Sequence, residues 1–109
     1  MTRSMSNKRQ KKAENVLELI RECIENDKYT MTTHALIRQS ERKISVAEIV
    51  HVLKTGYEEK RKTRFDEDSN KWKYAIKGKT KIDELDVRVI VAFDEFEMLI
   101  ITVMYIGNL

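Results

Sequence analysis

His34, Arg38 and Arg42 are the residues whose types and spacing could do chemistry, because they recur every four residues within one short segment. In a helix this spacing lines the side chains up along one side, so an imidazole would lie beside two guanidinium groups. A proton carrier next to two fixed cations suits the handling of a phosphate group. The alternative interpretation is an ordinary solvated helix face, since 36% of the residues are charged.

The residues around this stripe predict how the helix is oriented. Leu36, Ile37 and Ile44 fall on the opposite side, so the basic side is expected to face solvent or a ligand rather than the core. Thr33 is a residue type that caps a helix start, which would place free N–H groups and the positive dipole end beside His34. The dipole and the two arginines favour the neutral imidazole, the form that accepts a proton.

Hydrophobic periodicity predicts three helices in the first half of the chain. Apolar residues recur at three- and four-residue intervals between Val16 and Ile24, Ser45 and Glu48 form a capping-box pattern, and Gly56 is a natural helix stop. The predicted helices cover about residues 13 to 27, 33 to 43 and 45 to 55.

After Gly56 the pattern alternates, which is typical of strands. Polar and apolar residues alternate over about 60 to 65 and 71 to 77, while 85 to 93 and 98 to 106 are more apolar and predict central strands. Helices followed by a meander predict an α+β fold, with two to three N-terminal helices packed on a four-stranded antiparallel sheet.

The alternation also predicts a basic sheet face. If Trp72 faces the helices, Lys73 and Lys77 face the other way, beside Lys62 and Arg64. The alternative is that these lysines lie on an edge strand and only prevent sheet-to-sheet aggregation.

Thr102 is the one polar side chain in the run from Leu99 to Met104. A threonine is a good strand residue, so a structural role is an open alternative to a role in a site.

Length and composition narrow the class of protein. A chain of 109 residues is one small domain. Cys23 is the only cysteine, so no intrachain disulfide is expected. Cys23, His34 and His51 are not spaced as the ligands of a zinc site are, so no metal is expected. No cofactor is expected either. No apolar run reaches membrane-spanning length and no signal-peptide pattern is present, which predicts a cytoplasmic protein that does not engage a membrane.

Positive charge is concentrated at the N-terminus. The first twelve residues hold five of the 21 basic residues and no acidic one, which leaves sixteen basic residues against 18 acidic residues in the remainder. Residues 1 to 12 are therefore expected to form a disordered basic tail, and residues 13 to 109 a single domain.

Five stretches of the chain, taken in order, resemble one family pattern. They are His34 to Arg42, Ile44 to Ile49, Leu53 to Gly56, Trp72 to Gly78 and Ile101 to Tyr105. On their order and spacing the chain resembles a family of small uncharacterised bacterial domains placed near the RelE/ParE and MqsR toxins.

The resemblance implies a RelE-like fold, whose members include metal-independent ribonucleases acting as toxins. The family's recurring histidine, two arginines and last-strand threonine fall on His34, Arg38, Arg42 and Thr102. Asp86 stands where the family often has a histidine, so a second catalytic imidazole is not implied there.

Two functions follow. The first is the toxin of a bacterial toxin-antitoxin system, an endoribonuclease in which His34 is base or acid and the other three residues hold the phosphate. The second is a non-catalytic RelE-like module that binds nucleic acid or an acidic protein partner, such as a cognate antitoxin. RNA is the main expected partner, and a cognate antitoxin is a further one. Four residues are expected to bind the RNA from the sheet: Lys62, Arg64, Lys73 and Arg88.

Overall fold

The computed structural model describes residues 8–107. Its helices are α2 (Val16–Glu25), α3 (Thr33–Arg42) and α4 (Val46–Thr55). Its strands are β1 (Tyr29–Met31), β2 (Tyr57–Glu58), β3 (Arg64–Asp66), β4 (Lys71–Lys79), β5 (Asp86–Phe93) and β6 (Met98–Tyr105). The α+β class and the three helices are therefore confirmed.

The sheet has six strands and is mixed, so the prediction of four antiparallel strands was wrong. The strand order is β1-β6-β5-β4-β2, with β3 also pairing to β4, and the β1–β6 pair is parallel. Residues 29–31 fall between the predicted helices 13 to 27 and 33 to 43, where no strand was predicted. A strand of three residues has no alternation to detect, and its partner lies about seventy residues along the chain, at Met98–Ile100.

Each of the last two helices begins at a hydroxyl side chain. Thr32, rather than the predicted Thr33, caps α3, and its Oγ1 accepts a hydrogen bond from the Ala35 N–H at 3.1 Å. Ser45 caps α4 as predicted, accepting from the Glu48 N–H at 3.1 Å. The Glu48 carboxylate bonds elsewhere, because its Oε1 accepts from the Lys81 N–H at 2.6 Å. This bond ties the end of β4 to α4.

Gly56 directly follows α4, at a position where no side chain would fit. A Cβ at this position would lie 2.3 Å from the carbonyl oxygen of Lys77 and 2.7 Å from that of Val52. The backbone at Gly56 is extended, with φ of −83°, so close approach and not a left-handed conformation requires the glycine. The end of α4 can therefore pack directly on β4.

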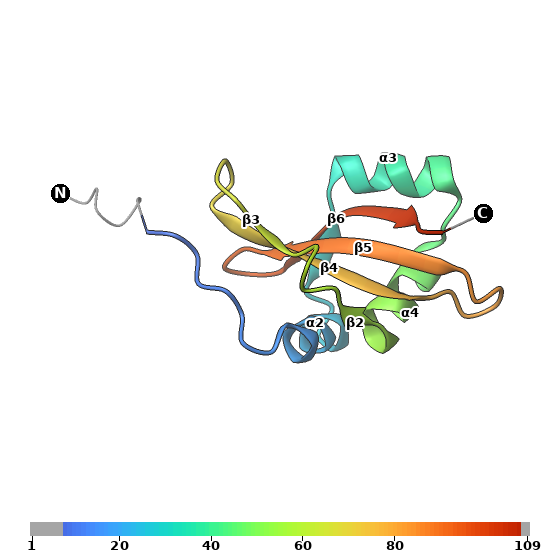
Figure 1. Cartoon of the computed structure of the whole chain (residues 1–109), viewed down its shortest axis with the longest axis horizontal. Helices are drawn as coiled ribbons and strands as arrows, with labels where there is room; N and C mark the ends of the chain where they lie inside the picture. The colour runs from blue at the N-terminus through green and yellow to red at the C-terminus, as the bar shows by residue number, and fades with distance from the viewer. Residues whose placement is uncertain (1–7, 108–109) are drawn as a thin grey trace.

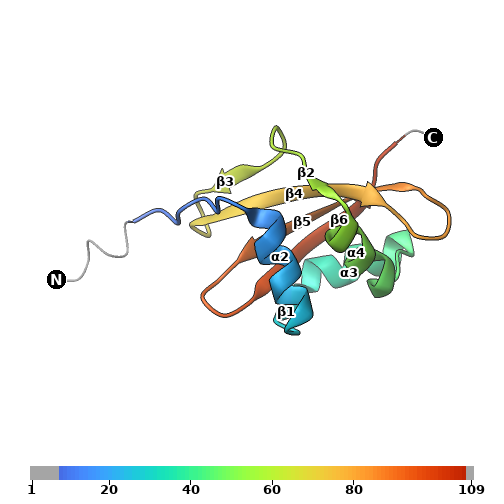
Figure 2. The ribbon, with the colours of Figure 1, turned by 90° about the horizontal axis from the view of Figure 1, so that it is seen from below.

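All three described helices lie on one face of the twisted sheet, and none of them covers the other face (Figures 1 and 2). Helix α3 packs on β6 and β1, whereas α4 packs on β4 and β5 and carries α2 on its side. Side chains alternate between faces along a strand, and paired residues share a face. The helix side is buried; its strand residues are Tyr74, Ile76, Val87, Val89, Val91, Phe93, Met98, Ile100 and Val103.

Residues 8–12 run along the β3–β4 hairpin. Gln10 is the main attachment: its Nε2 donates to the carbonyl of Phe93 and its Oε1 accepts from the N–H of Trp72, both at 2.8 Å. Arg9 lies over the ring of Phe65 at 4.0 Å. Residues 8–12 of the predicted tail therefore contact the domain, and residues 1–7 lie outside the described residues.

Within residues 8–107, no helix is long and apolar enough to cross a membrane.

Candidate nucleic-acid interface

Helix α3 is oriented differently from the prediction. Ala35 is fully buried, while Leu36 and Ile37 are 50% and 48% exposed. Arg38 and Arg42 are half-buried. The small Ala35 side chain lets α3 approach β6 closely, and the aliphatic stems of the arginines cover part of the contact. The basic side of α3 is therefore turned partly towards the sheet.

Arg42 completes the hydrogen bonding of the sheet edge. Strand β1 pairs with β6 only at Met98–Ile100, so the later carbonyls on that edge have no strand partner. Nη1 of Arg42 donates to the carbonyl oxygen of Val103 at 2.7 Å, and Thr32 Oγ1 donates to that of Ile101 at 3.3 Å. A buried carbonyl without a partner is costly, so Arg42 has a structural task.

The other members of the predicted α3 site are placed separately. Arg38 donates to Glu41 at 2.8 Å within the helix. His34 is exposed, and no hydrogen bond joins its side chain to another described residue. Thr102 pairs with Ile90 and lies on the open sheet face, whereas its neighbour Val103 lies in the core with Ala35. The structure brings Arg42 to the residue next to Thr102, but the threonine side chain lies on the face away from the core side of α3.

The open sheet face gathers cations from two long strands. By register and alternation, β4 contributes Lys71, Lys73, Lys77 and Lys79, and β5 contributes Arg88. Arg64 of β3 pairs with Lys73 and shares its face, as predicted. Because β4 lies between β5 and the short strands β2 and β3, its lysines are not on an edge strand. Protection of an edge therefore does not explain them.

Three carboxylates pair with three of these cations. Arg88 Nε and Nη2 donate to the two oxygens of Glu59 at 2.6 and 3.1 Å, with side-chain exposures of 18% and 17%. The hydrogen bond from Arg88 lowers the pKa of Glu59 and raises that of Arg88. Lys73 pairs with Asp66 at 3.3 Å and Lys79 with Asp86 at 2.9 Å.

These ion pairs divide the predicted RNA-binding residues into those that are paired and those that are not. Arg88 and Lys73 are engaged by carboxylates, so they position neighbours rather than offer free charge. Arg64, Lys71 and Lys77 form no ion pair with another described residue. Arg64 is exposed, and the two lysines are partly exposed. Lys62 is also exposed, in the loop that joins β2 to β3. The open face thus keeps a surplus of positive charge.

Tyr57 is a functional candidate that the sequence analysis missed. It pairs with Lys77 across β2 and β4, and its side chain is 55% exposed. An aromatic ring among cations is a platform on which a nucleobase can stack. No periodic pattern marks a two-residue strand, and the only available signal was an aromatic residue directly after the helix-ending Gly56.

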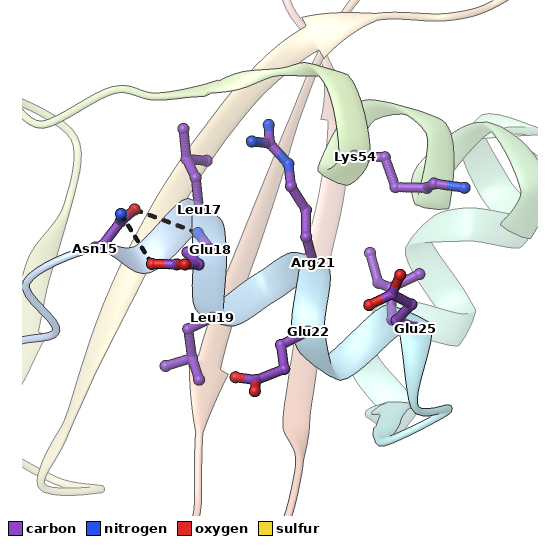
Figure 3. Close-up of a pocket in the computed structure, with 9 residues that line it drawn as sticks. Asn15, Leu17, Glu18, Leu19, Arg21, Glu22, Glu25 and Lys54 are labelled. Atoms are coloured by element: carbon purple, nitrogen blue, oxygen red, sulfur yellow. Dashed lines mark hydrogen bonds between the residues drawn. The ribbon is translucent and has the colours of Figure 1, made fainter.

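A hollow of about 1020 Å³ lies along α2, away from this face (Figure 3). Its charged lining residues are Glu18, Glu22, Glu25, Arg21 and Lys54. None of the predicted site residues lines it. Three carboxylates against two cations do not favour a polyanion, so this hollow is not the nucleic-acid interface.

Among residues 8–107, no group of three or more His, Cys, Asp or Glu side chains is placed to hold a metal ion.

Comparison with known proteins gives a family but no characterised relative. No curated protein and no solved structure matches the chain. The placement near RelE-like toxins stays a prediction. A match over residues 31–105 covers α3, α4 and all strands from β2 to β6, and shows that the chain belongs to the family described as Domain of unknown function (DUF4258).

Proposed function

We propose that this chain is a small RNA-binding module of RelE-like architecture, and that single-stranded RNA lies on the open face of its sheet. The observation that carries the proposal is the surplus of cations on that face, from Arg64, Lys71 and Lys77, beside the exposed ring of Tyr57. Lysines and arginines hold phosphates, and an exposed ring stacks bases without regard to sequence. The resemblance to families that include ribonucleases supports RNA over DNA.

The test is a binding titration of a fluorescent single-stranded RNA at several salt concentrations. Replacing Arg64 and Lys71 by Gln should weaken binding and lower the salt slope by about 1.4, because each phosphate contact to a single strand contributes about 0.7. The matched control replaces Lys28 and Lys54 by Gln, which removes the same charge away from this face. Equal losses in both variants, or binding only to a DNA strand of the same sequence, would refute the proposal.

A second candidate is the toxin reaction, in which RNA is cut without a metal. The exposed imidazole of His34, on a helix whose Arg42 reaches the residue next to Thr102, favours it. His34 would take the ribose 2′-OH proton or protonate the leaving oxygen. Arg38 and Arg42 would balance charge on the phosphate after giving up their bonds to Glu41 and to the Val103 carbonyl. A cognate antitoxin that covers α3 is part of this candidate.

Induced expression of the wild-type chain and of His34→Ala tests it, reading growth and RNA integrity. Growth arrest and RNA breakage by the wild type alone would support the toxin. Arg42→Lys should also impair cleavage, because a lysine keeps the charge but not the planar fork. Arrest by both chains would exclude His34 as a catalytic residue, and unaffected growth with intact RNA would leave the binding module as the function.

A further inference from the structure

A cleft of about 490 Å³ opens where β4 ends beside α4, and none of the residues discussed as an α3 site lines it. The lining residues that matter for a ligand are Gly56, Tyr57, Lys77, Gly78, Lys81 and Glu84. Its size falls within the range of about 300–1,000 Å³ that is usual for small-molecule sites. The lining combines one aromatic ring, hydroxyl groups and several cations.

The backbone around the cleft is held in place from two sides. The Glu48 carboxylate of α4 accepts a hydrogen bond from the Lys81 N–H at 2.6 Å. The loop that follows is closed at its base, because the Thr80 N–H donates to the Leu85 carbonyl at 2.9 Å and Thr80 Oγ1 accepts from the Leu85 N–H at 3.0 Å. Thr80 is only 6% exposed. The lysines on either side of it therefore start from fixed positions.

The glycines shape the floor of the cleft. Gly56 and Gly78 lie against each other, so that a Cβ on Gly78 would be 3.2 Å from the Cα of Gly56. With no side chain on either residue, the chain after α4 lies directly on β4, which fixes the backbone that carries Tyr57 and Lys77 into the lining of the cleft.

The charges define the ligand. Lys79 is paired with Asp86, and its hydrogen bond is the main cause of the lowered pKa of that carboxyl. Lys77 and Lys81 have no ion pair with any described residue, and Glu84 is the only carboxylate in the lining. Two available ammonium groups match a phosphomonoester, which carries about −1.5 to −2 charges at neutral pH, better than an internal diester with one.

We infer that this cleft binds a nucleotide that carries a terminal phosphate, with its base on Tyr57 and its phosphate between Lys77 and Lys81. The inference deepens the proposed function and rests on it where the nucleotide is the end of an RNA strand. Lys77 belongs to both surfaces, and Lys71 lies about 20 Å from it along β4, so a short strand on the open face would lead into the cleft.

Three probes separate the possible sources of the nucleotide: hexauridylate with a terminal phosphate, hexauridylate with hydroxyl ends, and free uridine monophosphate. Calorimetric titration at low salt should show tighter binding of the phosphorylated hexamer than of the hydroxyl form. Lys81→Gln should remove most of that difference, about tenfold for a charge-assisted contact. Tyr57→Ala should weaken binding at least about fivefold, as loss of base stacking does, while Tyr57→Phe keeps it.

Lys28→Gln is the matched control, since it removes one charge outside the cleft, and circular dichroism checks that every variant is folded. Equal binding of both hexamers, together with no binding of the monophosphate, would overturn the cleft and leave the proposed function intact. Binding of the monophosphate alone, lost in Lys81→Gln, would support the cleft and overturn the RNA track. Absence of binding to all three probes would overturn both.

Discussion

Glu59→Gln is the most informative single change, because it breaks the ion pair that occupies Arg88 on the open face. Both side chains are more than four-fifths shielded from solvent, and both carboxylate oxygens accept hydrogen bonds from the guanidinium. Breaking a fully buried pair costs about 3–5 kcal/mol and an exposed one about 0–1 kcal/mol. This pair is largely shielded but not fully buried, so we expect a loss of about 1–3 kcal/mol in the free energy of unfolding.

The same change should improve RNA binding. In the wild type Arg88 bonds to Glu59 and cannot contact a phosphate without losing that bond. The glutamine is uncharged, so it no longer neutralises Arg88. The positive charge of Arg88 then becomes available to a phosphate on the face that holds the RNA. The salt slope of RNA binding should rise by about 0.7, the value for one added phosphate contact to a single strand.

Urea unfolding and RNA titration of the same preparations measure the two effects. Glu41→Gln is the control, since it breaks the exposed pair with Arg38 and frees a guanidinium on α3 instead of on the sheet. It should change stability little and leave RNA binding by the open face unchanged. Weaker RNA binding by a folded Glu59→Gln chain would refute the argument that Arg88 is held back by Glu59. Stability equal to that of the wild type would show that the pair contributes nothing.

Three further predictions concern stability. Because the hydrogen bond from Arg88 lowers the pKa of Glu59, the pair should stabilise the fold fully above the unfolded carboxyl pKa of about 4.3, and the contribution should disappear as pH falls through the lower folded value. The stability gap between wild type and Glu59→Gln, measured by urea unfolding at pH 7 and at a series of lower pH values, should therefore narrow towards the acid end. Gly56→Ala should cost about 1–3 kcal/mol in the same assay, since its Cβ would meet backbone oxygens that cannot move aside without separating α4 from β4. Gln10→Ala should cost about 1–2 kcal/mol and speed amide exchange at Trp72, whose N–H bonds to the glutamine; unchanged exchange there would argue against the contact.

The parts of the fold that were predictable are those with a long, regular pattern. The three helices were found from their helical period, β4 from its alternation, and β5 and β6 from apolar runs that cover each strand. Strand β1 was missed because its three residues are specified by pairing with β6, which no local pattern reports. Where a segment is too short to show a hydrophobic period, its tertiary contacts decide its structure.

The orientation of α3 shows the limit of amphipathicity as a guide. Leu36 and Ile37 suggested the buried side, yet the buried residue is Ala35, which allows a close approach to β6. The edge of β6 also has carbonyl groups without a strand partner, and Arg42 supplies the donor that they require. The carbonyl that Arg42 binds belongs to a strand about sixty residues further along the chain. The ten residues of the helix give no sign of it.

The basic face was predictable from alternation, but its available charge was not. Arg88 and Lys73 were correctly assigned to strands, and the carboxylates that occupy them come from the β2–β3 loop and from β3. Those pairings depend on the register between strands, which the sequence alone does not provide.

Thr102 lies between the sheet face proposed to bind RNA and the helix that carries the candidate catalytic residues. Its side chain belongs to the open face, while the next carbonyl, of Val103, is bound by Arg42 of α3. Strands β4 and β6 are two strand spacings apart, about 10 Å, so RNA held by Lys77 could extend across β5 to Thr102 within a few nucleotides. Binding and cleavage would then use separate residues. If the toxin candidate is right, neutralising the open-face cations should raise KM with kcat maintained, whereas His34→Ala should lower kcat with little change in KM. If the module only binds, His34→Ala should leave RNA affinity as it is in the wild type.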